Sequence, residues 1–232
     1  MTASSNPDPA DKRNDSPVHF EFTEPAAIEQ ESMRRISLGL QERGIEIEEA
    51  LLPVVRRVIH TTADFEYAET LFFTEDVITY AHHAIRGGKT IITDTNMALA
   101  GISKPACRKW NCQPVCYMAD PEIAAKAKED GTTRAYAAMV RAAGEYPDGI
   151  YVIGNAPTAL LCLDRLIRAG SCRPSLVIGV PVGFVNVVES KELLRAACLR
   201  CHIPAIFNMG QKGGSGVAAA VMNALLYTAG AD

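Results

Sequence analysis

The chain has 232 residues, of which 48% are hydrophobic, and its 23 basic and 27 acidic residues give a net charge of −4. This length and apolar content predict one folded domain with a substantial core. The mild acidic balance argues against a nucleic-acid partner, and the short apolar runs argue against a membrane-spanning helix, which needs about 20 such residues.

Residues 1–20 are polar and rich in Pro, Asp and Ser, and they lack the apolar core of a secretory signal peptide. They predict a disordered leader ahead of a single domain at residues 21–232, in a cytoplasmic protein. The following part, residues 24–86, is mainly helical in its patterning, and we expect it to pack against the rest of the domain.

Residues 46–60 predict an amphipathic helix in which Pro53 either kinks the helix or starts its regular part. Its apolar stripe at helical spacing consists of Ile47, Leu51, Val54, Val55 and Val58. His60 lies well off that stripe, and Arg57 lies on the polar side of the helix. A histidine that merely filled the core would be expected on the stripe, so this position favours a functional role for His60.

From residue 88 onward, short apolar runs alternate with helix-like segments. The runs are KTIITD, PVCYM, GIYVIG, SLVIGV and PAIFNM, and their lack of polar alternation is typical of strands buried on both faces. Between them, residues 121–144, 156–170 and 189–200 have helical spacing, and Gly170 suits the position after a helix end. The sequence therefore predicts an α/β fold, with a parallel sheet covered by helices on both faces.

Glycine-rich or polar loops follow four of these strands. Two of them, VIGNAPTAL and VIGVPVGFV, end a strand on Val-Ile-Gly and carry a proline two or three residues after the glycine. Asn155 could cap the helix after the first loop, and Glu189 or Ser190 the helix after the second. The carboxyl ends of parallel strands share one edge of a sheet, so these loops predict a ligand crevice where backbone N–H groups after Gly154 and Gly214 meet an anion. The alternative is that the glycines serve only as turn residues.

The seven cysteines predict reduced thiols in a cytoplasmic protein. Cys198, Cys201 and His202 match the C-x-x-C-H pattern of covalent haem attachment, and Cys112 with Cys116 forms a looser pair that could suggest zinc. Haem attachment is disfavoured because it normally takes place outside the cytosol. Buried, unreactive thiols and no metal site are the expected outcome.

Five motifs together resemble the precorrin-8X methylmutase (precorrin isomerase) family, which includes the cobalt-precorrin-8 methylmutases. They are IHTTADFEYA, TDTNMALAGI, GTTRAYAA, GNAPTAL and GVPVGFVNVVESKE, in this order along the chain. The resemblance spans residues 24–228. It implies an isomerase of cobalamin biosynthesis that moves a methyl group from C-11 to C-12 of a corrinoid macrocycle, in a homodimeric α/β enzyme with its sites near the subunit interface.

The resemblance also assigns roles to residues. It implies that His60 is the catalytic proton donor and that Ser32, Arg57 and Arg134 contact the substrate. With the loops at the sheet edge, the candidate substrate-binding residues are Ser32, Arg57, Asp94, Thr95, Asn96, Arg134, Gly154, Asn155, Thr158, Gly179, Gly183, Glu189, Ser190, Gly213 and Gly214. A methyl shift within one molecule needs no redox partner, so no protein-bound cofactor or metal is expected.

The motifs around His60 and Asp94 look more like those of the anaerobic enzymes, which act on cobalt-precorrin-8 and form cobyrinate. The cobalt then belongs to the substrate. The metal-free substrate, precorrin-8X, would instead give hydrogenobyrinate. Two other hypotheses are a corrinoid carrier without catalysis and an unrelated nucleotide-binding enzyme. No phosphate-binding fingerprint is present, which disfavours the nucleotide-binding enzyme.

Overall fold

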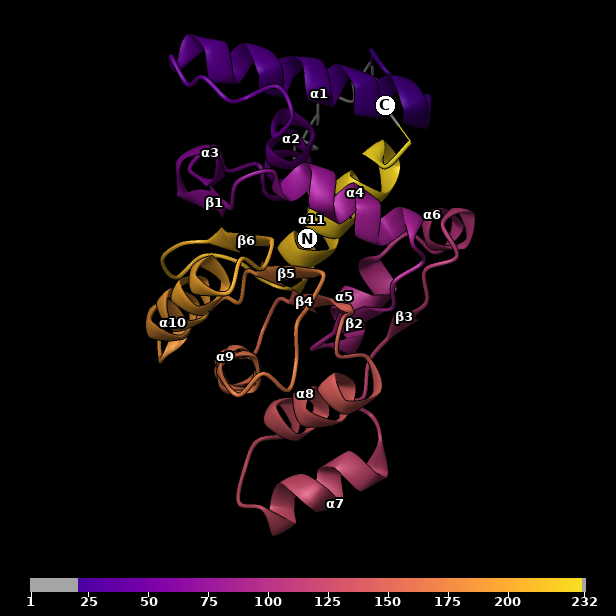
Figure 1. Cartoon of the computed structure of the whole chain (residues 1–232). Coiled ribbons are helices and arrows are strands. Elements are labelled where there is room, and N and C mark those ends of the chain that lie inside the picture. Colours follow the sequence, from indigo (N-terminus) through magenta and orange to yellow (C-terminus); the bar gives the residue numbers. More distant parts are fainter. Residues whose placement is uncertain (1–20, 231–232) are drawn as a thin grey trace, which may run out of the picture.

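The structure, a computed structural model, describes residues 21–230, so the predicted leader at residues 1–20 lies outside the described residues. A six-stranded sheet forms its centre, in the order β1-β6-β5-β4-β2-β3 (Figure 1). The five predicted strands are confirmed as a parallel set, namely β2 (Ile91–Thr93), β3 (Pro114–Val115), β4 (Ile150–Ile153), β5 (Leu176–Gly179) and β6 (Ala205–Asn208). One strand was not predicted: β1 (Leu71–Phe73) lies antiparallel to β6 at the sheet edge.

Helices cover both faces of the sheet, as the alternating pattern predicted. One face packs against α2 (Leu52–Thr62), α4 (Val77–Arg86), α5 (Asn96–Gly101), α6 (Lys104–Lys109) and α11 (Ser215–Thr228). The other face packs against α7 (Pro121–Glu129), α8 (Arg134–Glu145), α9 (Pro157–Arg168) and α10 (Val187–Arg200). The two faces have separate apolar cores, and the residues of the strands β2, β4, β5 and β6 between them are fully buried.

The N-terminal helices form a third layer outside α11. The long helix α1 (Pro25–Glu42) crosses α2 at the top of Figure 1, and the one-turn helix α3 (Tyr67–Thr70) leads into β1. Ile36 and Leu40 of α1 pack against Val55 and Ile59 of α2 in a small third core. Helix α2 packs on α11, while α4 contacts β5 directly and β1 pairs with β6, so the predicted packing of the N-terminal part against the sheet is confirmed.

Two helix boundaries differ from the sequence-based expectation, and one is confirmed. The segment 121–144 is two helices, because Gly131 takes a left-handed φ of +63° and Thr133 then caps α8 through its side chain. The helix expected over 46–60 begins only at Leu52, with Pro53 in its first turn. Gly170 has a φ of +70° directly after α9, so its predicted role at the helix end is confirmed.

The loops that follow β2, β4, β5 and β6 lie together at the carboxyl edge of the sheet. Backbone hydrogen bonds join them: Val180 N–H donates to Ile153 O at 2.8 Å, and Gly214 N–H donates to Val180 O at 2.8 Å. The end of α2 belongs to the same region, because a Cβ on Gly216 would lie 4.0 Å from Cγ2 of Thr61. His60, one residue before Thr61, is therefore close to this edge.

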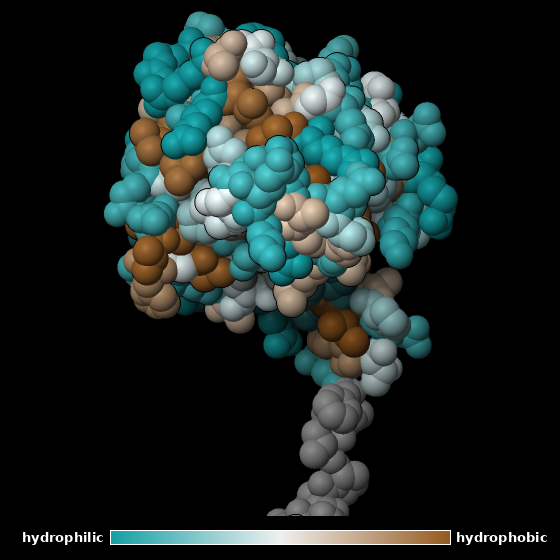
Figure 2. Space-filling view, turned by 90° about the horizontal axis from the view of Figure 1, so that it is seen from below, coloured by the Kyte–Doolittle hydropathy of each residue, from teal (hydrophilic) through white to brown (hydrophobic). Residues whose placement is uncertain are grey.

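The sequence predicted no membrane-spanning helix, and the helices and the surface of the structure can be compared with that prediction. No helix within residues 21–230 is both long and apolar enough to cross a membrane. Figure 2, which looks at the end of the molecule where α7 lies, shows hydrophilic side chains over most of that face and hydrophobic ones in small separate groups.

Candidate active site

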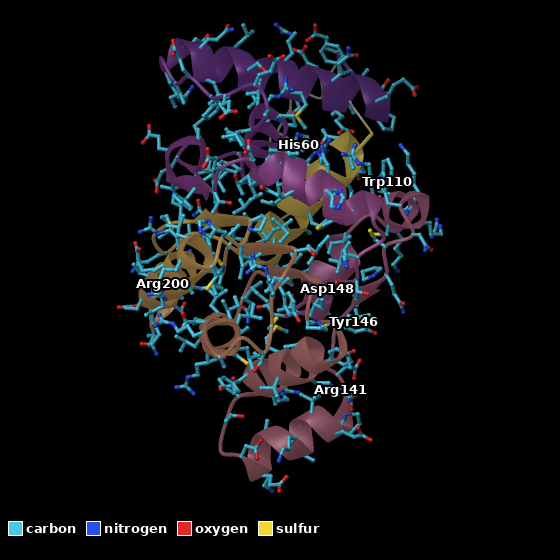
Figure 3. The ribbon with its side chains drawn as sticks, viewed as in Figure 1. His60, Trp110, Arg141, Tyr146, Asp148 and Arg200 are labelled. Atoms are coloured by element: carbon cyan, nitrogen blue, oxygen red, sulfur yellow. The ribbon has the colours of Figure 1, made fainter. Side chains whose placement is uncertain are left out.

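His60 lies in the last turn of α2 and is exposed, as its position off the apolar stripe predicted. Its Nδ1 is 2.7 Å from Oγ of Ser32, which belongs to α1 (Figure 3 labels the histidine). The packing of Ile59 against α1 brings these two side chains together. The serine fixes the orientation of the ring through Nδ1, so Nε2 is the nitrogen left available to a substrate.

Arg57 lies one helical turn before His60 and makes a parallel contact with α1. Its Nη1 is 2.7 Å from Oε1 of Glu29, and its guanidinium lies 5.1 Å from the ring centre of Tyr227 in α11. The Glu29–Arg57 and Ser32–His60 pairs are each three residues apart on their helices, so both stabilise the same crossing of α1 and α2. Much of the charge of Arg57 is balanced within the protein.

A cavity of about 870 Å³ opens between α1 and the end of α2, and His60 and Ser32 line it. Its apolar lining comes from Ile28, Ile36, Ile59 and Phe65, and charged side chains of α1 surround it. Among them, Glu31 accepts hydrogen bonds from Arg34 and Arg35, which lower its pKa to about 2. The site thus combines one histidine with an apolar wall and a charged rim.

Asp94 is a fully buried residue whose carboxylate is occupied by the neighbouring loop. Its oxygens accept hydrogen bonds from the backbone N–H groups of Gly154, Asn155 and Ala156 at 2.7–2.8 Å. Burial raises the pKa of Asp94, while the three backbone donors favour its charged form. The predicted anion site at the amides after Gly154 is therefore wrong, because these donors already bind Asp94.

The loop glycines at the sheet edge are required for close packing. A Cβ on Gly154 would lie 2.8 Å from Cα of Ser215, and one on Gly179 would lie 2.4 Å from Cε1 of Phe207. A Cβ on Gly213 would lie 2.1 Å from the carbonyl oxygen of Val180. The amide of Gly214, also predicted to bind an anion, donates instead to that same carbonyl. These contacts favour the alternative that the glycines bring the loops together.

The predicted caps at Asn155, Glu189 and Ser190 are wrong. The N-cap of α9 is Ala156, whereas Asn155 is exposed in the loop before it. Helix α10 begins earlier than expected, at Val187, so Glu189 is an exposed residue of its first turn. Ser190 is buried within the same helix, and its hydroxyl donates to the carbonyl of Val187 at 2.9 Å.

The remaining candidates lie at several different places in the fold. Thr95 caps α5 and its Oγ1 is 2.8 Å from Oγ of Ser215, while the exposed Asn96 lines a separate cavity of about 410 Å³. Thr158 lines a third cavity, of about 440 Å³, over α8 and α9 on the other face of the sheet, and Arg134 begins α8 beside it. Gly183 follows β5, and its N–H donates to Gln211 O at 3.1 Å.

Sequence reasoning missed a polar cluster formed by the residues that follow α2 and the loop before α11. Nζ of Lys212, in the loop between β6 and α11, is 2.5 Å from Oδ2 of Asp64 and 2.8 Å from Oε2 of Glu66. Both hydrogen bonds raise the pKa of Lys212. Lys212 itself belongs to the loop of Gly213 and Gly214, where only the glycines had been considered. No local spacing could have paired it with residues 146 and 148 positions away.

Only the first cysteine of the C-x-x-C-H segment lies in the packed core, whereas Cys201 is half-buried and His202 is exposed. Cys198 is fully buried, and burial raises its pKa to about 12, so it is a poor nucleophile or metal ligand. His202 follows the end of α10 with a left-handed φ of +50°. Within the part of the chain that the structure describes, no three His, Cys, Asp or Glu side chains form a group that could hold a metal ion.

Comparisons with known proteins agree on one family. The sequence model of precorrin-8X methylmutase matches residues 27–228. The cobalt-precorrin-8 methylmutase of Priestia megaterium is 42% identical over 202 residues, which are 87% of each chain. The precorrin-8X methylmutase of Pseudomonas aeruginosa is 33% identical over 199 residues, 86% of this chain and 93% of its own. The crystal structure of precorrin-8X methyl mutase from Thermus thermophilus superposes with a TM-score of 0.78 at 40% identity, covering 88% of this chain and 96% of that one.

Proposed function

This chain belongs to the precorrin-8X methylmutase family, isomerases of cobalamin biosynthesis, and we propose that it moves a methyl group from C-11 to C-12 of cobalt-precorrin-8 to give cobyrinate. The preference for the cobalt substrate is supported by the curated relatives: those named for cobalt-precorrin-8 reach 44% identity, against 33–34% for those named for precorrin-8X. The Thermus thermophilus structure, which is named for precorrin-8X, is 40% identical, so identity alone supports the preference only weakly. The names of these relatives do not support the alternative of a corrinoid carrier without catalysis.

His60 is the group we propose for the proton transfer, and the hydrogen bond from Ser32 at 2.7 Å in a cavity of about 870 Å³ is the observation that carries this assignment. His60 accepts the hydrogen bond of Ser32 through Nδ1 and offers the Nε2 proton to the macrocycle. The methyl group then migrates from C-11 to C-12 with its bonding electrons, and the macrocycle returns the proton to His60. Substrate and product have the same composition, as an isomerisation requires.

Substrate binding in this proposal divides between shape and charge. The apolar wall of the cavity suits the face of a macrocycle, and basic side chains suit its acetate and propionate groups. Arg134 has no ion pair with the described residues, so it is the freer of the two candidate arginines, while Arg57 would have to share its charge with Glu29. We propose that no protein-bound cofactor or metal takes part, because the shift is internal to one molecule.

We also propose a homodimer, in the cytoplasm. The loop after β5 supports the first point, because its apolar side chains Val182, Phe184 and Val185 are 46%, 87% and 74% exposed. A second subunit would cover them beside the sheet edge, where Gly183 N–H meets Gln211. The cysteines of the described residues are all unpaired, which suits a reducing compartment. Sedimentation velocity gives the subunit count, and a monomer at micromolar concentration would contradict the dimer.

The function is tested by turnover on the two substrates side by side. The purified protein should convert cobalt-precorrin-8 to cobyrinate. The conversion is measured by the change in absorbance and by a change in chromatographic retention without a change in mass. The metal-free substrate should react with a lower kcat/KM. Tight binding of cobyrinate without any conversion of either substrate would instead identify a carrier. Faster conversion of the metal-free substrate would reverse the choice of substrate.

A further inference from the structure

Lys191 is a buried ammonium group that the proposed reaction does not use. It belongs to α10, its side chain is fully buried, and Nζ donates to the carbonyl oxygens of Gly210 at 2.7 Å and Lys212 at 2.9 Å. No carboxylate of the described residues forms an ion pair with it. Burying such a charge without a counterion costs stability, and a methionine would fill the same space without that cost. A role in the site would explain why a lysine is found here.

The two carbonyls belong to a loop that would otherwise be loosely held. Gly210, Gly213 and Gly214 all have positive φ values, in a conformation that glycine adopts freely. The carbonyl of Lys212 also accepts a hydrogen bond from Nδ2 of Asn208 at 2.9 Å. Donors from α10 and β6 therefore converge on this one residue and fix the direction in which its side chain leaves the loop.

The Lys212 side chain leads from this loop to the catalytic helix. Its Nζ binds Asp64 and Glu66, and the amide of Glu66 donates to Oδ1 of Asp64 at 3.0 Å. These residues follow Ala63, the left-handed residue that ends α2, whose amide donates to Ile59 O at 2.7 Å. The segment 63–66 is thus the continuation of the turn that carries His60, and Lys212 is its anchor to the sheet.

We propose that Lys191 is a positioning residue for His60, acting through the backbone of the 209–214 loop and the Lys212 ion pairs with Asp64 and Glu66. Lys191 touches neither His60 nor the 870 Å³ cavity. Its effect on catalysis follows from the placement of the helix end, because a small displacement of a catalytic group lowers kcat strongly. Only the kinetic part of the test rests on the proposed function; the structural part does not.

Amide hydrogen exchange of the free enzyme tests the mechanical link without any substrate. Lys191→Met should speed exchange in residues 209–214, which it contacts, and also by about three- to fivefold in residues 63–66, which it does not contact. Lys212→Met should have the same effect on 63–66. In the Lys212→Met background, adding Lys191→Met should change 63–66 no further, because the connection is already broken. Lys89→Met, which removes an ion pair with Asp148 next to β2 and β4, is the matched control and should leave both segments unchanged.

The kinetic test separates positioning from binding. Lys191→Met should lower kcat about 10-fold and leave the dissociation constant of the product within about twofold, since Lys191 does not contact the ligand. Faster amide exchange in 209–214 with unchanged exchange in 63–66 would overturn the proposal. Additive effects of Lys191→Met and Lys212→Met on the exchange of 63–66 would overturn it as well. If Lys191→Met does not fold, Lys212→Met decides, because the Lys212 side chain is 42% exposed and lies outside the apolar core; unchanged exchange at 63–66 would refute the link. A wild-type enzyme without turnover would refute the proposed function and leave the exchange result to stand.

Discussion

The buried amine of Lys191 should make the stability of the fold depend on pH in an unusual direction. Burial lowers its pKa from 10.5 to about 8. In the unfolded chain the amine keeps its proton up to about pH 10.5, so between these values the unfolded state binds more protons than the folded state. The free energy of unfolding therefore rises with pH across this window. Below about pH 8 both states are charged, and the folded state carries the full cost of the buried charge.

The magnitude follows from the pKa difference. At about 1.4 kcal/mol per pH unit, a fall from 10.5 to about 8 corresponds to about 3 kcal/mol gained between pH 8 and pH 10.5. Buried thiols act in the opposite direction: burial raises the pKa of Cys198 to about 12, so the unfolded state loses that proton first as the pH rises. A comparison with Lys191→Met removes this contribution, because both proteins contain the same cysteines.

Urea unfolding of the wild type and Lys191→Met, at about pH 7.5 and about pH 10, measures this linkage. The difference in unfolding free energy between the two proteins should shift by about 2–3 kcal/mol in favour of the wild type at the higher pH. The substitution also changes packing, which shifts the unfolding free energy by the same amount at both pH values. Such a constant difference does not affect the result. Parallel pH profiles would show that the Lys191 amine keeps an ordinary pKa, and would refute its burial as a charge without a counterion.

Three further substitutions test the site and the sheet edge. Asp94→Asn should lower the unfolding free energy by about 2–4 kcal/mol, because buried backbone donors lose a charged acceptor, and an unchanged urea midpoint would contradict this. Gly213→Ala should cost about 2–3 kcal/mol, since its Cβ would lie 2.1 Å from a carbonyl, whereas Gly216→Ala, with 4.0 Å to its nearest neighbour, should be neutral or stabilising. Ser32→Ala should lower kcat up to about 10-fold through loss of the hydrogen bond to His60, and an unchanged kcat would show that the ring needs no such support.

The sheet was predictable because its strands are buried on both faces, and residues such as Ile150–Ile153 are therefore apolar without interruption. The strand β1 was not predicted because it has only three residues, all half-buried, at the edge of the sheet. The break between α7 and α8 depends on the left-handed backbone of Gly131, and a glycine inside a helical pattern does not by itself show whether the helix stops.

The site was predictable only in part. The helical stripe alone indicated that His60 faces solvent, but its pairing with Ser32 spans 28 residues, and only the family resemblance suggested the serine. The loop glycines were assigned to ligand binding because their packing partners are distant in sequence: Val180, after β5, lies against Gly213, and Phe207 of β6 lies against Gly179. The contacts of Lys212 with Asp64 and Glu66 depend on how two distant loops meet, which composition and periodicity cannot specify.

The central claim is that His60 performs the proton transfer of a methyl shift, and His60→Ala tests it most directly. His60 is exposed, so the variant should fold and should still bind cobyrinate, and loss of the hydrogen bond to Ser32 should lower the urea midpoint only slightly. His83→Ala, which removes an exposed histidine of α4, is the matched control. We predict that single-turnover conversion of cobalt-precorrin-8 falls at least about 100-fold in His60→Ala and stays at the wild-type rate in His83→Ala. Conversion by His60→Ala within a few-fold of wild type would contradict the account.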